Sequence, residues 1–96
     1  MLLHTLNCAA DSEAFHDCLR TAGPEDTIVL LGEGVYRALP GTASRRDLDA
    51  SPARVVVLDT DADAAGVTPR LGGLALVDMD ALVALSETYP RQIAWY

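Results

Sequence analysis

Lysine is missing from this chain of 96 residues, in which all seven strongly basic side chains are arginines. A chain without lysine cannot use Schiff-base catalysis. It also lacks the lysine of a phosphate-binding loop and the lysine with which receiver domains and some phosphatases hold a transferred phosphoryl group. Several classes of enzyme are excluded by this one absence.

Long apolar runs, cysteines and histidines are also scarce. No run approaches the roughly 20 apolar residues that are needed to span a bilayer, and the first residues have neither the basic start nor the long apolar stretch of a signal peptide. We therefore expect a cytoplasmic protein with no membrane segment. The spacings of His4, Cys8, His16 and Cys18 match none of the paired patterns of zinc sites, so we expect no metal and no other cofactor.

The charge balance is acidic. Fourteen acidic side chains against seven arginines give a formal net charge of −7. Nucleic-acid binding depends on clustered basic side chains that displace counterions from the phosphates, and here only Arg45 and Arg46 are adjacent. We therefore expect no direct binding of this chain to nucleic acid.

The length and the pattern of apolar residues indicate one small domain, residues 1–96. Four apolar stretches predict buried strands, at residues 2–6, 27–31, 54–58 and 74–77. Helical spacing of apolar residues predicts a helix that begins at the capping residues Asp11 and Ser12 and ends at Gly23. Further helical segments are predicted at residues 34–39, 42–50, 61–65 and 80–88.

Strands that alternate with helices predict an α/β fold with a small, mainly parallel sheet and helices on both faces, of Rossmann-like or flavodoxin-like type. A sheet of four or five strands in so short a chain has little sequence left to cover its edges. We therefore expect partner subunits to supply part of the cover.

The segment Asp59-Thr60-Asp61 follows an apolar strand, as does the first motif of haloacid-dehalogenase-type phosphatases, in which the first aspartate attacks phosphorus. A phosphoryl-transfer or receiver-like domain that uses Asp59 and Asp61 is therefore an alternative. The motif lies late in the chain and the required lysine is absent, so we instead predict that Asp61 caps a short helix.

The loop Gly32-Glu33-Gly34 follows the second predicted strand and opens a helical segment. Its backbone N–H groups could receive an anion, but the loop lacks the spacing of a dinucleotide-binding motif and Glu33 adds a repelling charge. We therefore attribute its glycines to turn geometry.

Five short segments, taken together, resemble the TusB/DsrH family. They are MLLHTLN at 1–7, DCLR at 17–20, GEGVYRAL at 32–39, VDMDALV at 77–83 and PRQIAW at 90–95. The resemblance lies in their order and spacing, and it spans nearly the whole chain. Gly34, Val35 and Tyr36 match the family pattern, whereas Gly32 and Glu33 depart from it.

The resemblance implies a DsrE/DsrF/DsrH-like fold and a subunit of a heterohexameric sulfurtransferase complex. Such a complex holds two copies each of three homologous chains, so the implied partners are TusC/TusD-like, or DsrF/DsrE-like, subunits and the sulfur-carrier proteins that the complex serves. The implied function is the relay of persulfide sulfur between proteins, toward 2-thiolation of the wobble uridine of tRNA. A DsrH-type role in cytoplasmic sulfur oxidation is the alternative, and in either case this chain is expected to be an accessory subunit.

Cys18 is the candidate sulfur acceptor, because some DsrH members have a cysteine in the same Cys-Leu-Arg or Cys-Leu-Lys context. A sulfur carrier needs an accessible thiolate, which nearby positive charge favours, and His16 and Arg20 are close in sequence. Against this, Cys18 lies on the same helical stripe as Phe15, and cysteine is often buried. A core role therefore stays open beside the catalytic one, as does a disulfide between Cys8 and Cys18.

The end of the chain carries large apolar side chains at Ile93, Trp95 and Tyr96. Aromatic residues are enriched in the cores of protein interfaces, so these three and Tyr36 are candidate interface residues. The other interpretation is that the tail folds back onto its own sheet.

Overall fold

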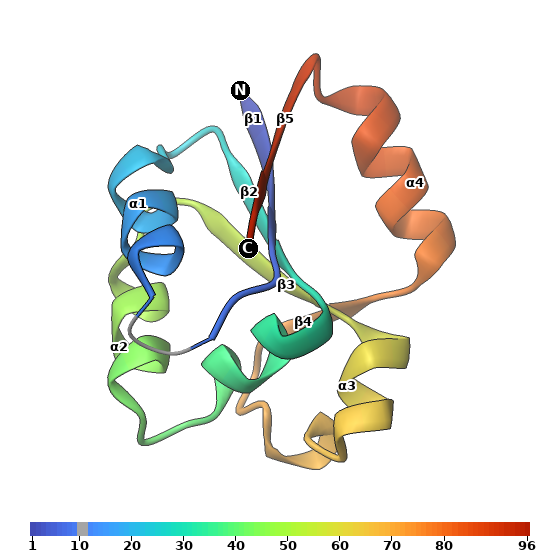
Figure 1. Cartoon of the computed structure of the whole chain (residues 1–96). Helices are drawn as coiled ribbons and strands as arrows, with labels where there is room; N and C mark the ends of the chain where they lie inside the picture. The colour runs from blue at the N-terminus through green and yellow to red at the C-terminus, as the bar shows by residue number, and fades with distance from the viewer. Residues whose placement is uncertain (10–11) are drawn as a thin grey trace.

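A five-stranded sheet forms the centre of the computed structural model, which describes residues 1–9 and 12–96 (Figure 1). Its strands lie in the order β4-β3-β2-β1-β5, and each neighbouring pair is parallel. They are β1 Leu2–Leu6, β2 Thr27–Leu30, β3 Arg54–Leu58, β4 Ala75–Val77 and β5 Arg91–Trp95. The predicted α/β fold with a mainly parallel sheet is confirmed.

The fifth strand, β5, was not among the four predicted strands. It pairs with β1 along its whole length, from Leu2 opposite Arg91 to Leu6 opposite Trp95. The backbone N–H of Asn7 extends the pairing with a bond of 2.9 Å to the carbonyl of Trp95. The tail therefore folds back onto its own sheet.

In the described residues, four α-helices and two 3₁₀ helices connect the strands. The α-helices are α1 Glu13–Thr21, α2 Ala43–Ala50, α3 Asp59–Ala65 and α4 Met79–Thr88, and the 3₁₀ helices are η1 Gly32–Ala38 and η2 Thr68–Arg70. Side-chain caps explain where three of them begin, because Ser12, Thr42 and Asp78 accept bonds from the backbone N–H groups of Phe15, Arg45 and Ala81. Asp11, the other predicted cap of the first helix, lies outside the described residues.

One prediction about these helices is wrong. The third helix begins at Asp59, with Leu58 in the cap position and no side-chain cap, so Asp61 is not a cap. It lies in the first turn, and its carboxylate accepts a bond from the backbone N–H of Gly32. The predicted helix at residues 34–39 is a 3₁₀ helix that begins two residues earlier, at Gly32.

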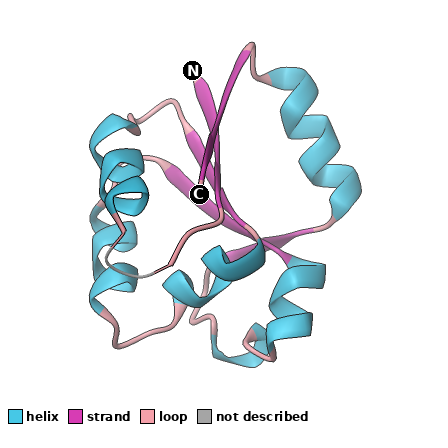
Figure 2. Cartoon of the chain, viewed as in Figure 1, coloured by secondary structure: helices cyan, strands magenta, loops and turns pink. Residues whose placement is uncertain are grey.

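Helices cover both faces of the sheet, but unequally. α1 and α2 lie on one face and α4 lies on the other (Figures 1 and 2). The first face carries the larger core cluster, which includes Leu6, Phe15, Ile28 and Val57. The second face carries a smaller cluster, in which Leu3, Val29 and Val56 are buried under partly buried side chains such as those of Leu82 and Leu85.

Arg45 is buried rather than exposed, although its neighbour Arg46 is exposed. Its Nη1 donates to the carbonyls of Ala38 and Leu71, at 2.6 Å each. Its Nη2 donates to the carbonyl of Gly72 at 2.9 Å, and its Nε donates to Asp49 at 2.9 Å. The guanidinium therefore ties α2 to the end of η1 and to the segment after η2.

Candidate functional site

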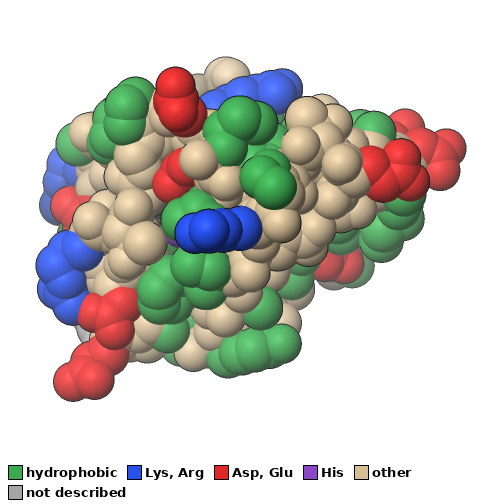
Figure 3. Space-filling view, turned by 90° about the horizontal axis from the view of Figure 1, so that it is seen from above, with side chains coloured by type: hydrophobic (Ala, Val, Ile, Leu, Met, Phe, Trp, Pro, Cys, Tyr) green, Lys and Arg blue, Asp and Glu red, His purple; other side chains and the backbone are tan. Residues whose placement is uncertain are grey.

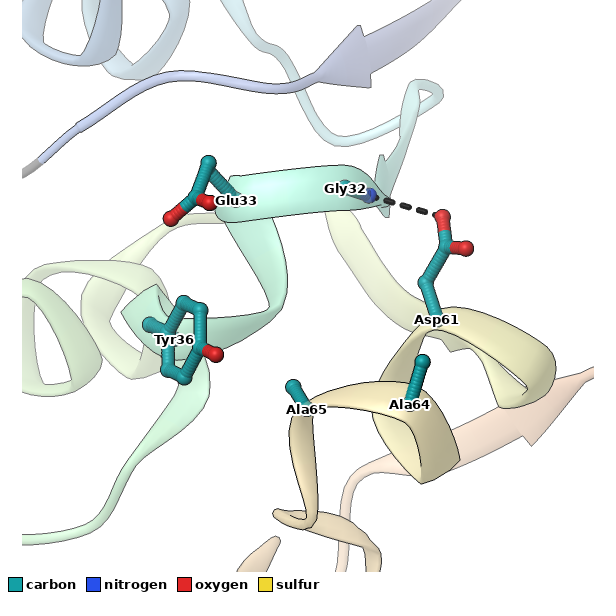
Figure 4. Close-up of a pocket in the computed structure, with 6 residues that line it drawn as sticks. All are labelled: Gly32, Glu33, Tyr36, Asp61, Ala64 and Ala65. Carbon is teal, nitrogen blue, oxygen red and sulfur yellow. Dashed lines mark hydrogen bonds between the residues drawn. The ribbon is translucent and has the colours of Figure 1, made fainter.

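A small cavity lies beside the carboxyl ends of β2 and β3 (Figure 4). Its volume is about 200 Å³, and its lining comes from two elements. Gly32, Glu33 and Tyr36 of η1 form one side, while Asp61, Ala64 and Ala65 of α3 form the other. Ligands of open parallel sheets commonly bind at this end of the strands, so this cavity is the first candidate site.

The backbone donors at the start of η1 already have protein acceptors. The N–H of Gly32 donates to Oδ2 of Asp61 at 2.7 Å, and the N–H of Glu33 donates to Oδ1 of Asn7 at 2.9 Å. Carboxylates of Glu33 and Asp61 line the cavity. An anion would therefore meet negative charge, and the N–H groups of Gly32 and Glu33 are already engaged, which argues against phosphate binding here.

The phosphoryl-transfer alternative gains little from this geometry. Asp59 begins α3, and its Oδ1 is buried without a hydrogen-bond partner. Asp61, however, is engaged by Gly32. Within residues 1–9 and 12–96, no group of three or more His, Cys, Asp or Glu side chains is placed to hold a metal ion, and the same part of the chain has no helix that is long and apolar enough to cross a membrane.

Cys18 lies in the larger core cluster and is fully buried, as is Phe15 beside it on α1. Burial raises the pKa of the Cys18 thiol to about 12, and the negative fields of Cys8 and Asp26 add to the rise. Arg20, which could have stabilised a thiolate, is instead exposed and paired with Asp17. The thiol is therefore protonated at neutral pH, which favours the core role over the catalytic one.

Cys8 is buried in the same cluster, and both cysteines are free thiols. We expect neither to react quickly with a thiol reagent such as DTNB at neutral pH in the native protein, and both to react in denaturant, because attack needs an exposed thiolate. The release of the chromophore measures this directly. In Cys8→Ser, rapid labelling of the remaining thiol of the native protein would show instead that Cys18 is accessible.

The four candidate interface residues differ in exposure. Ile93 and Trp95 are half-buried as residues of β5, and Tyr36 is half-buried against the larger core cluster. Tyr96 is 82% exposed. Tyr96 is thus the tail residue whose side chain is most available to a partner, and the interface roles of all four stay predictions.

A buried polar network that the sequence analysis missed joins the two ends of the chain. His4 on β1 lies with its Nε2 at 3.0 Å from Oδ2 of Asp26, and its Nδ1 accepts a bond of 3.0 Å from the indole N–H of Trp95. Asp26 also accepts from the backbone N–H groups of Leu2 and Gly23, at 2.8 and 2.9 Å. Both ring nitrogens of His4 are therefore in use, which leaves none for a metal.

Asp26 is the acidic member of this network. Burial acts to raise the pKa of its carboxyl group, but the hydrogen bonds from His4, Gly23 and Leu2 favour the carboxylate and lower the pKa below its usual value. His4 belongs to the segment MLLHTLN at residues 1–7, and Trp95 belongs to the segment PRQIAW at residues 90–95. Their presence in those segments was the available signal, but it does not show that the two side chains meet.

A family model described as "DsrH like protein" matches residues 8–92 of the chain. The chain belongs to the DsrH family. Among curated relatives, Protein TusB of Pectobacterium parmentieri is 35% identical over 95 residues, which cover 98% of this chain and 100% of that protein. Protein TusB of Escherichia coli K12 is 32% identical with the same coverage. The resemblance predicted from the sequence is confirmed.

Two solved structures have a similar fold. Protein Tm0979 from Thermotoga maritima has a TM-score of 0.69 and 26% identity, with 92% of this chain and 93% of that one covered. The ychN protein from E. coli has a TM-score of 0.77 over 98% of this chain and 97% of that one, and at 16% identity it is similar in fold alone.

Proposed function

We propose that this DsrH-family chain is a subunit of a sulfur-relay complex that passes persulfide sulfur between proteins in the cytoplasm. The observation that carries the proposal is the similarity to TusB proteins over 98% of the chain. The absence of lysine and the scarcity of accessible thiols support a subunit that does not carry out the chemistry by itself.

The proposed partners are homologous α/β chains of the TusC/TusD type, or the DsrF/DsrE type. The thin cover on the α4 face supports this, because no residue of α4 is buried and Met79 and Val83 are exposed on it. Seen from above, acidic side chains lie at the tip of the α4 side of the molecule, next to hydrophobic ones (Figure 3). Leu76 of the edge strand β4 is exposed as well. Exposed apolar side chains of this kind mark candidate contact surfaces.

We propose 2-thiolation of the wobble uridine of tRNA as the destination of the sulfur, with DsrH-type sulfur oxidation as the alternative. Similarity to TusB proteins supports the first. The net charge of −7 fits a subunit that contacts proteins and leaves tRNA to another enzyme. Cys18 as a secondary sulfur acceptor stays a prediction, and it would require α1 to move so that the buried thiol becomes accessible.

Co-expression with the TusC- and TusD-like chains of the same genome tests the proposal. We expect one heteromeric complex by size-exclusion chromatography with light scattering, and we expect deletion of this chain to lower the 2-thiouridine content of tRNA, measured by mass spectrometry. Because Cys18 is buried, expression of the Cys18→Ser variant in the deletion strain should restore the 2-thiouridine content of tRNA. A chain that stays monomeric beside these partners, with unchanged tRNA thiolation and sulfur oxidation in the deletion strain, would contradict the proposal.

A further inference from the structure

The hydrogen bond between Trp95 and His4 depends on the protonation of His4. An indole N–H can only donate, so Nδ1 of His4 must accept, and the ring proton of the neutral imidazole is therefore on Nε2, facing Asp26. In a protonated imidazole both nitrogens are donors. Two N–H groups would then face each other where Trp95 and His4 are now 3.0 Å apart.

We propose that His4 is a proton-operated latch for the end of β5: the neutral ring holds the indole of Trp95, and protonation releases it. The inference is independent of the proposed sulfur-relay function, because it rests only on the burial of His4 and on its two hydrogen-bond partners. The latch connects β1 to β5, which are 91 residues apart at this contact.

Asp26 makes protonation of a buried ring feasible, and Trp95 makes it consequential. The carboxylate of Asp26 can accept a hydrogen bond from Nε2–H in both protonation states of the ring. Its negative charge also stabilises the imidazolium once Nδ1 is protonated. Only the bond from Trp95 distinguishes the latched state from the released one. A ligand shifts an equilibrium by its differential interaction with the two states, and here the ligand is the proton.

Other titratable groups around the ring are few in the described part of the chain. α1 contributes the buried thiol of Cys18, and the segment after β1 contributes that of Cys8. β2 contributes none, since its residues are Thr27–Leu30. β5 contributes Arg91, which is exposed and pairs with Leu2, and the loop before β2 contributes the exposed Glu25 next to Asp26. Asp26 is thus the titratable side chain that His4 contacts.

The released state involves the end of β5 and not the whole strand. Five residue pairs hold β5 to β1, from Leu2 opposite Arg91 to Leu6 opposite Trp95, and the loss of one side-chain hydrogen bond does not outweigh that ladder. We therefore expect the indole to leave its place beside His4 while residues 91–93 stay paired.

The fluorescence of Trp95 reports on the latch, because it is the single tryptophan of the chain. On acidification from about pH 8 to about pH 5, the range in which histidine side chains generally titrate, we expect the emission to shift to longer wavelength while far-UV circular dichroism stays constant. His16→Gln removes the other histidine, which is exposed on α1, and should leave the shift unchanged. A shift that His16→Gln abolishes, or an emission that changes only when the fold is lost, would overturn the proposal.

A second measurement needs no substitution of His4. Nitrogen NMR of the imidazoles should place the proton of neutral His4 on Nε2. In Trp95→Phe, which removes the donor, His4 should take up its second proton at a pH higher by roughly 0.5 to 1 unit, the shift expected for one hydrogen bond. His16 should titrate unchanged in both proteins and serves as the internal control. An Nδ1–H tautomer, or equal midpoints for His4 in the two proteins, would refute the latch.

Discussion

Replacing Gly34 by alanine is expected to destabilise the protein by about 3 kcal/mol, the upper part of the range for overpacked sites. A Cβ at this position would lie 2.0 Å from the carbonyl oxygen of Leu6 and 2.9 Å from its carbonyl carbon. The obstacle is backbone of β1, which is hydrogen-bonded on both sides by β2 and β5 and cannot move aside cheaply. Urea denaturation followed by circular dichroism gives the change in the free energy of unfolding.

Gly23→Ala is the matched control. Nothing lies within 4 Å of a Cβ at Gly23, and its φ is not among the positive ones. Its N–H, which donates to Asp26, is kept in alanine. We expect a change within about 0.5 kcal/mol. If Gly34→Ala unfolded at the same urea concentration as Gly23→Ala, the close approach of η1 to β1 would be wrong.

Arg45→Met is the second substitution with a large expected effect, a loss of about 3 kcal/mol or more. Methionine keeps much of the apolar stem but removes every donor, so the carbonyls of Ala38, Leu71 and Gly72 lose the partner that they share. A buried polar group that is left without its hydrogen-bond partner generally costs about 1 to 3 kcal/mol, and here three carbonyls share one donor. In a domain of about 100 residues, each kcal/mol lowers Tm by roughly 4 to 8 °C, so thermal unfolding should detect the loss easily.

Arg46→Met separates the role of position 45 from the loss of a positive charge. Arg46 lies next to Arg45 on α2 but is exposed, and an exposed substitution should change the free energy of unfolding by no more than about 0.5 kcal/mol. Arg45→Lys should fall between the two, because a lysine keeps the charge but not the planar fork of donors. Equal Tm values for the variants at 45 and 46 would show that the buried guanidinium contributes nothing.

The predicted strands and helices were largely confirmed because their signals are local. The four apolar stretches are short and end at turn residues, so each matches a strand within one residue at either end. Ser12 was a local signal for the start of the first helix, because a serine at this position can accept a hydrogen bond from the backbone N–H of Phe15. The prediction that Asp61 is a cap was wrong because the sequence alone does not distinguish an aspartate in the first turn of a helix from one in the cap position. Only the fold places Asp61 beside Gly32.

The contacts that could not be predicted are those between distant segments. Arg45 bonds to carbonyls that lie 7, 26 and 27 residues away, and nothing in the pair Arg45-Arg46 indicates which of the two is buried. Likewise, the segment that contains Trp95 was too short and too mixed to identify as a strand. Its pairing with β1 depends on the free edge that β1 offers after it has paired with β2.

The strand order also bears on how the protein is made. β1 precedes the other four strands along residues 1–96, yet its second neighbour in the sheet is β5, which follows them. While translation proceeds, one side of β1 has no backbone partner, and an unpaired edge can join another chain. This side of the sheet can therefore close only after residues 91–95 have left the ribosome and are free to pair with β1.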